Sequence, residues 1–144
     1  MAHEDAGHYG AKHPADRKLN EKIAGAVREK NMDGKISCAE ASRIAGQLQV
    51  SMADVGVTID LLEIYLNKCQ LGLFGYSPKK MIVKPAESVT PELEAAIRKA
   101  LVKERLSCLS AWEIAEETGM TRMAISSACE KLKIKIKPCQ LGAF

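Results

Sequence analysis

The feature that most limits the possible folds is an internal repeat at an offset of seventy residues. The phrase "CQLG" begins at Cys69 and again at Cys139, and aligning 37–74 with 107–144 without gaps gives 12 identities in 38 positions. Self-similarity at a fixed offset indicates two copies of one supersecondary unit. We therefore expect a chain of 144 residues to form two small domains.

Changes in composition along the chain predict the boundaries of these domains. The polar N-terminus contains all three histidines, and their spacing of five gathers them on no common helical face, so it is predicted to be a flexible tail. Proline, lysine and the apolar stretch "MIV" separate the two copies. The predicted segments are a tail over 1–16, repeat 1 over 17–76, a linker or short strand over 77–87, and repeat 2 over 88–144.

Helix signals are clearest in repeat 2. Hydrophobic residues make up 47% of the sequence but aromatic ones only 4%, which favours helices over a β-sandwich. Thr90 and Pro91 open the first predicted helix, the second covers about Ser110 to Thr118, and the third runs from Thr121 to Leu132. The "KIKIKP" that follows alternates like a half-buried strand with its lysines on one side.

The segment "SAWEIAEETGMTRMAISSACEKL" resembles the helix-turn-helix of winged-helix DNA-binding domains. Ala115 is the small residue at the helix crossing, Gly119 makes the turn and Ile125 anchors the next helix; the resemblance is strongest over Ser110–Pro138. Repeat 1 follows the pattern less closely, because Gln49 replaces the turn glycine and Gly56 weakens its third helix. The resemblance implies a mainly α fold with short β wings, built as a tandem duplication of a winged-helix-like three-helix unit.

The two copies differ in charge where this class contacts DNA. Residues 121–138 carry five basic side chains and one acidic, whereas 51–68 carry one basic and three acidic, so only repeat 2 suits a phosphate backbone. The resemblance implies that the third helix enters the major groove and that the strand lies against phosphates. The predicted DNA-binding residues are Thr121, Arg122, Ser126, Ser127, Lys131, Lys133, Lys135 and Lys137.

Each of these assignments has a simpler alternative. The lysines could be the solvated side of an amphipathic helix and of an edge strand, where lysine prevents aggregation. Repeat 1, with its apolar third helix, is expected to pack against repeat 2 or to form a homodimer with repeat 1 of a second chain.

Four cysteines occupy matched positions in the two repeats. In each repeat, one cysteine opens the second helix and the other follows the strand. The four together could bind zinc or an iron–sulfur cluster, or each pair could form a redox disulfide. The sequence has no Cys-x-x-Cys pair, and buried packing explains a duplicated cysteine equally well. These candidate ligands are Cys38, Cys69, Cys108 and Cys139.

No pattern of catalytic residues is recognisable, so we expect a protein that is not an enzyme. The sequence has no apolar run long enough to span a membrane and no signal-peptide pattern, so a cytoplasmic location without membrane contact is predicted. The leading hypothesis is a DNA-binding transcriptional regulator that binds double-stranded DNA through repeat 2. The alternative is a protein-interaction adaptor with structural, metal-binding or redox cysteines.

Overall fold

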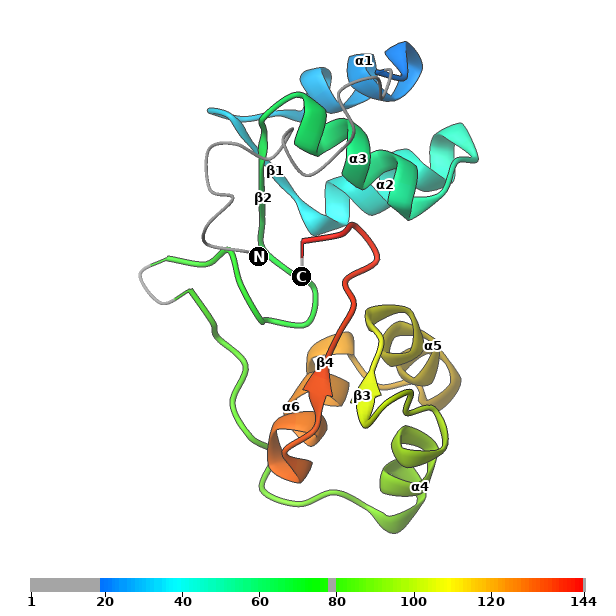
Figure 1. The fold of residues 1–144 in the computed structure, drawn as a ribbon. Helices are drawn as coiled ribbons and strands as arrows, with labels where there is room; N and C mark the ends of the chain where they lie inside the picture. The colour runs from blue at the N-terminus through cyan, green and yellow to red at the C-terminus, as the bar shows by residue number, and fades with distance from the viewer. Residues whose placement is uncertain (1–18, 78–79, 144) are drawn as a thin grey trace. The chain divides into compact units, whose positions relative to one another are not determined.

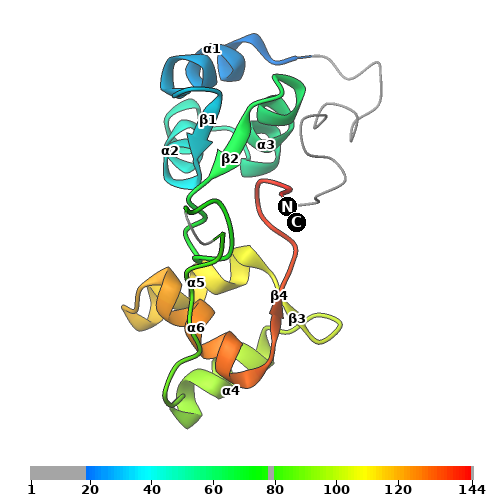
Figure 2. The same ribbon diagram turned by 90° about the vertical axis from the view of Figure 1, so that its left-hand side faces the viewer.

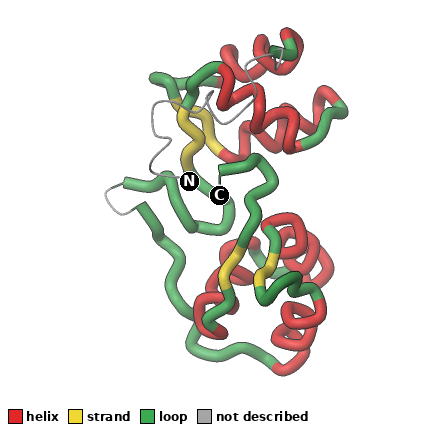
Figure 3. The backbone as a smooth tube through the Cα atoms, viewed as in Figure 1, coloured by secondary structure: helices red, strands yellow, loops and turns green. Residues whose placement is uncertain are grey.

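The computed structural model describes residues 19–77 and 80–143, which form a mainly α protein with small sheets (Figures 1 and 3). The predicted tail over 1–16, with its histidines, lies outside the described residues. The chain divides into two compact units, and the division does not follow the sequence order throughout. Unit 1 contains Met1–Cys69 and Leu141–Phe144, and unit 2 contains Gln70–Gln140.

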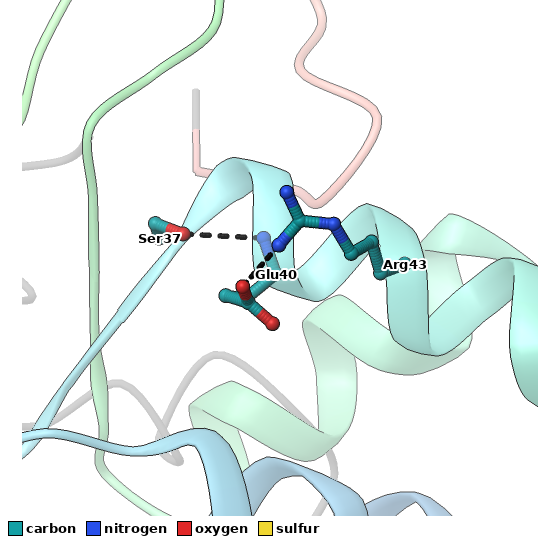
Figure 4. Close-up of polar contacts among 3 residues, drawn as sticks. All are labelled: Ser37, Glu40 and Arg43. Atoms are coloured by element: carbon teal, nitrogen blue, oxygen red, sulfur yellow. Dashed lines mark hydrogen bonds and ion pairs between the residues drawn. The ribbon is translucent and has the colours of Figure 1, made fainter.

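The described residues of unit 1 form three helices and two short strands. Asn20, Ser37 and Ser51 cap the three helices, each accepting a hydrogen bond from the backbone N–H three residues later. At the start of the second helix, Ser37 Oγ accepts from the Glu40 amide at 3.1 Å and Arg43 donates to the Glu40 carboxylate (Figure 4). The elements are α1 (Glu21–Lys30), β1 (Lys35–Ser37), α2 (Cys38–Leu48), α3 (Met52–Leu61) and β2 (Tyr65–Asn67).

Unit 2 has the same order of elements, with bounds displaced by about seventy residues. The helix starts predicted at Thr90 and Thr121 are confirmed as N-caps, and Gly119 ends a helix at φ 70° as predicted. The middle helix begins at Cys108, earlier than expected, because the Ser107 hydroxyl accepts from the Ser110 amide at 3.0 Å and caps it. The elements are α4 (Pro91–Lys99), β3 (Arg105–Leu106), α5 (Cys108–Thr118), α6 (Arg122–Leu132) and β4 (Lys135–Ile136).

The strand after the third helix of each unit pairs in parallel with the strand between the first two helices. β1 lies beside β2, as Figure 2 shows, and β3 pairs with β4 in the register Arg105↔Lys135 and Leu106↔Ile136. A wing would require a strand returning antiparallel after the third helix. Residues 81–87 are described and form no strand. Within residues 19–77 and 80–143, the sheets are two parallel pairs of strands.

Branched aliphatic side chains fill the core of each unit, as the low aromatic content predicts. β1, β3 and β4 each contribute one buried residue, Ile36, Leu106 and Ile136, and in β2 Leu66, the partner of Ile36, is half-buried. One side of each pair therefore packs against the helices. The largest fully buried side chains are Ile23, Val27, Ile36, Ile44 and Val55 in unit 1 and Leu71, Ile97, Leu106, Ile125, Ser126 and Cys129 in unit 2.

A tight turn precedes β1 and β3, and only one of the two turns has a glycine. Asp33 and Gly34 have φ of 54° and 78°, and Lys103 and Glu104 have φ of 51° and 64°. Positive φ at both central residues is the geometry of a type I′ turn, for which Asp-Gly is favoured. The Lys-Glu turn of unit 2 therefore holds two side chains in a left-handed conformation that disfavours them.

We predict that Glu104→Gly raises the free energy of unfolding by about 1 kcal/mol. A left-handed backbone costs a non-glycine residue about 1–2 kcal/mol. The greater freedom that glycine gives the unfolded chain offsets part of this gain. Urea denaturation at high salt, followed by fluorescence of Trp112, measures this in unit 2, since the sequence has one tryptophan.

The matched control is Gly34→Glu, which places the unit 2 residue in the turn of unit 1. No atom lies within 4 Å of the added Cβ, so strain alone should lower the stability, which circular dichroism would follow. Stabilisation by both substitutions, or by neither, would contradict the assignment of strain to this turn position.

Candidate nucleic-acid interface

Five basic side chains gather on the exposed side of the β3–β4 pair. The parallel register puts Arg105 opposite Lys135, and Lys133 and Lys137 lie two residues either side of Lys135 along the chain. Lys103 is in the turn before β3, and all five residues are exposed. Within the part of the chain that the structure describes, none of the five forms an ion pair. We call Lys103, Arg105, Lys133, Lys135 and Lys137 the basic face.

The corresponding positions of unit 1 lack this charge. Subtracting seventy from each residue number gives one basic residue, two acidic residues, a tyrosine and an asparagine. The backbone there has the same parallel pairing, so the difference lies in the side chains. The residues of unit 1 are Asp33, Lys35, Glu63, Tyr65 and Asn67.

A backbone hydrogen bond joins the end of β4 to β3 at the centre of the basic face. The Lys137 amide donates to the Leu106 carbonyl O at 2.8 Å, and the Ile134 amide donates to the Cys129 carbonyl O at 2.9 Å as α6 ends. Ile134 and Ile136 are buried while the three lysines between and around them are exposed. Burial of the isoleucines on either side therefore fixes Lys135 on the exposed side of β4.

The first turn of α6 is occupied by contacts within unit 2. Thr121 caps the helix by accepting from the Ala124 amide at 3.0 Å. Half-buried Arg122 stacks on Trp112, with Cζ 3.6 Å from the ring centroid, and donates to Gln70 Oε1 at 3.3 Å. An arginine held by an aromatic ring and an amide is less available for a base edge than the exposed lysines are.

The middle of α6 is covered rather than exposed. Ser126 has 0% of its surface exposed, because it lies on the same side of the helix as buried Ile125 and Cys129. Ser127 is half-buried, and its carbonyl O accepts from the Ala86 amide at 3.0 Å, where the chain passes α6 before α4 begins (Figure 2). Ser126 is therefore not placed to contact a base, contrary to the expectation from the helix-turn-helix resemblance.

The eight residues predicted from the sequence thus separate into two groups. Lys131, Lys133, Lys135 and Lys137 are exposed towards the C-terminal end of α6 and along β4. The other four lie in the first half of α6, where Thr121 is exposed, Arg122 and Ser127 are half-buried and Ser126 is fully buried.

A hollow of about 670 Å³ lies beside the turn between α5 and α6. Its wall includes the exposed carboxylates Glu113 and Glu116 as well as Arg122. Carboxylates at this end of the helix pair oppose binding of a phosphate chain. The electrostatics therefore favour the basic face over the turn between α5 and α6 as the surface for a polyanion.

Sequence reasoning missed Lys103 and Arg105. They lie thirty residues before their neighbours on the basic face, and only the parallel pairing brings them close. The available signal was the short extended piece between the first two helices of repeat 2, which needs a strand partner because its backbone groups would otherwise be unpaired.

The four repeat-matched cysteines fall into two pairs, one in each unit. Cys38 and Cys69 are buried in unit 1, and Cys108 is buried in unit 2 with Cys139 half-buried. The Cys108 amide donates to the Pro138 carbonyl O at 3.0 Å, so Cys139 follows directly after a residue bound to the start of α5. None of the five cysteines is joined in a disulfide, and the residues that the structure describes include no cluster of three or more metal-ligating side chains.

Comparisons with protein-family models, with curated proteins and with solved structures found no match to this chain. Among the helices that the structure describes, none has the length and apolar character needed to cross a membrane.

We predict that Cys129 is the slowest of the five cysteines to react with iodoacetamide at pH 8. Burial, together with the charge of Glu130, raises the pKa of the Cys129 thiol to about 11, so almost none of it is the reactive thiolate. Mass spectrometry of peptides from briefly alkylated protein measures the five rates, with half-buried Cys139 expected to react first.

The control is the same reaction in denaturant, where the rates should converge because burial is lost. A rate for Cys129 in the folded protein equal to that of Cys139 would contradict the packing of α6.

Proposed function

We propose that the protein binds double-stranded DNA through the basic face of unit 2 and acts in the cytoplasm as a transcriptional regulator. The observation that carries the proposal is the charge contrast at matched positions, five positive side chains in unit 2 against one positive and two negative in unit 1. A scaffold that repeats its backbone but concentrates lysine and arginine on one copy has the electrostatic footprint of a phosphate-binding surface.

We infer that the two units arose by tandem duplication of one winged-helix-like three-helix unit. Support comes from helix starts at Glu21 and Pro91, at Cys38 and Cys108, and at Met52 and Arg122, each seventy residues apart. Under this proposal, the parallel strand pair replaces the wing of that class.

The proposed mode of binding is contact with the DNA backbone. Lysine and arginine side chains on a short strand pair neutralise phosphates and release counterions, which gives affinity with little dependence on sequence. The side of α6 that would read bases contains buried Ser126 and is hydrogen-bonded at Ser127 to Ala86. Base contacts from Thr121, Arg122, Ser126 and Ser127 are therefore not part of the proposal.

A protein-interaction adaptor is the second candidate, and one observation favours it. Met32 and Val102 occupy matched turn positions and expose 77% and 70% of their surfaces. Paired apolar tips suit a protein partner, such as a second copy bound through repeat 1. Met32→Ser and Val102→Ser would abolish partner binding under this alternative and leave DNA affinity nearly unchanged under the main proposal.

We predict that changing Lys133, Lys135 and Lys137 together to glutamate abolishes binding to mixed-sequence duplex DNA. In a fluorescence anisotropy titration at several salt concentrations, the affinity of the unmodified chain should fall with a log–log slope of about 0.9 for each phosphate that it neutralises, whereas the triple variant should give no binding signal.

The matched control changes three exposed lysines of unit 2 outside the basic face, Lys80, Lys84 and Lys99, to glutamate. The two variants have the same net charge, so a difference between them measures the location of the charge. Equal weakening of both variants would show that overall charge alone governs binding, and would contradict the assignment of the face.

We also predict that Arg105→Gln weakens binding to all duplex sequences by a similar factor and lowers the salt slope by about 0.9, because the arginine pairs with a phosphate and not with a base. Lys35→Gln, at the matched position of unit 1, should leave both quantities unchanged. Weaker binding to only some sequences would instead assign Arg105 to base recognition.

A further inference from the structure

Gly56 lies inside α3, where glycine is unfavourable to the helix. A Cβ atom built on Gly56 would lie 2.0 Å from the Leu141 carbonyl O, 2.7 Å from its carbonyl C and 3.0 Å from its Cα. All three are backbone atoms, so no side-chain rotation would relieve the clash. Glycine is therefore required here because another piece of backbone lies directly on the helix.

The backbone that lies on α3 belongs to the segment 141–143. Leu141 has 4% of its surface exposed and Ala143 has 9%, so both side chains take part in the packing of unit 1. Residues 138–140, which connect this segment to β4, belong to unit 2. The last part of repeat 2 thus completes the core of the unit formed by repeat 1.

The earlier copy of Cys-Gln-Leu-Gly, which begins at Cys69, passes in the opposite direction, from unit 1 to unit 2. Cys69 belongs to unit 1, and Gln70 and Leu71 belong to unit 2, where Leu71 has 0% of its surface exposed. A Cβ built on Gly72 would lie 3.2 Å from Met123 Cε on α6, so this glycine also lies close to the third helix of a unit. In both copies of Cys-Gln-Leu-Gly, the chain therefore passes from one unit to the other. The leucine and glycine of each copy pack with the unit formed by the other repeat.

We propose that the surface of α3 at Gly56 is a binding site for the segment Leu141–Ala143, and that a second copy of the chain can supply this segment. Reciprocal exchange of one segment between two matched units is the arrangement that two chains have in a segment-swapped dimer. The inference rests on the tandem duplication proposed above and is independent of DNA binding. It also explains why the sequence repeats this phrase and why α3 tolerates a glycine.

The shape of the α3 surface at Gly56 determines which segment can bind there. The Gly56 surface admits a backbone at contact distance, and a leucine followed by small residues fills the space beside it. Within one chain, the segment is present at an effective concentration of about millimolar, so the intramolecular complex dominates in dilute solution. Binding between chains becomes measurable when the intramolecular complex is disabled.

The test mixes two full-length variants that are each defective in one half of the complex. Gly56→Ala blocks the site with the Cβ described above while favouring the helix, and Leu141→Asp places a charge on the segment that must be buried. The intact segment of the first variant can then bind only the intact site of the second. We expect each variant alone to remain at 15.7 kDa by light scattering and the mixture to form a 1:1 complex of twice that mass.

Failure of the mixture to form a complex, with both variants folded by circular dichroism, overturns exchange between chains. If Leu141→Asp does not fold, Leu141→Ala replaces it in the same experiment. Amide hydrogen exchange of Gly56→Ala tests the site separately: residues 142 and 143 should exchange at least about tenfold faster than in the unmodified chain, as expected for a segment released from a folded unit. Unchanged exchange would overturn the assignment of the site itself.

Discussion

The parallel pairing of two very short strands is the interaction on which the arrangement of each unit depends. In unit 2 it joins Leu106 to Lys137 through a backbone hydrogen bond of 2.8 Å, and in unit 1 the Tyr65 amide donates to the Gly34 carbonyl O at 2.9 Å. Each pair buries one side against the helices and leaves the other exposed. The pairing that completes the core therefore also forms the exposed side on which the basic face of unit 2 lies. In unit 2 it also leads the chain after β4 past the start of α5, where the Cys108 amide donates to the Pro138 carbonyl O.

The local elements could be predicted from the sequence because their signals are local. Hydroxyl side chains at Thr90, Ser107 and Thr121 mark helix starts, and Gly119 marks a turn. The long-range features could not be predicted. Strands of two or three residues carry too little alternation to reveal a partner, and nothing in the local pattern of α6 shows that Ser126 is buried or that Ala86 binds the helix backbone. From the sequence, Gly56 appeared only to weaken α3. The reason for a glycine there is the backbone of Leu141, eighty-five residues later in the chain.

The two units display different side chains on one order of helices and strands. Unit 1 has weakly charged strands and a helix surface that accepts a backbone segment at Gly56, where unit 2 has Ser126. Unit 2 has the concentrated lysine and arginine side chains, and its turn residues Lys103 and Glu104 tolerate a backbone conformation for which unit 1 uses glycine. The proposed difference between the units is that only unit 2 binds phosphates, while each unit packs with the leucine–glycine part of the phrase from the other repeat.

The most direct test of the proposed function is an NMR titration of the ¹⁵N-labelled chain with a mixed-sequence DNA duplex. We predict that amide shift changes concentrate at residues 103–105 and 133–137, where backbone and side chains form the basic face, and that they disappear at high salt. Changes concentrated at residues 121–127, or confined to unit 1, would contradict it.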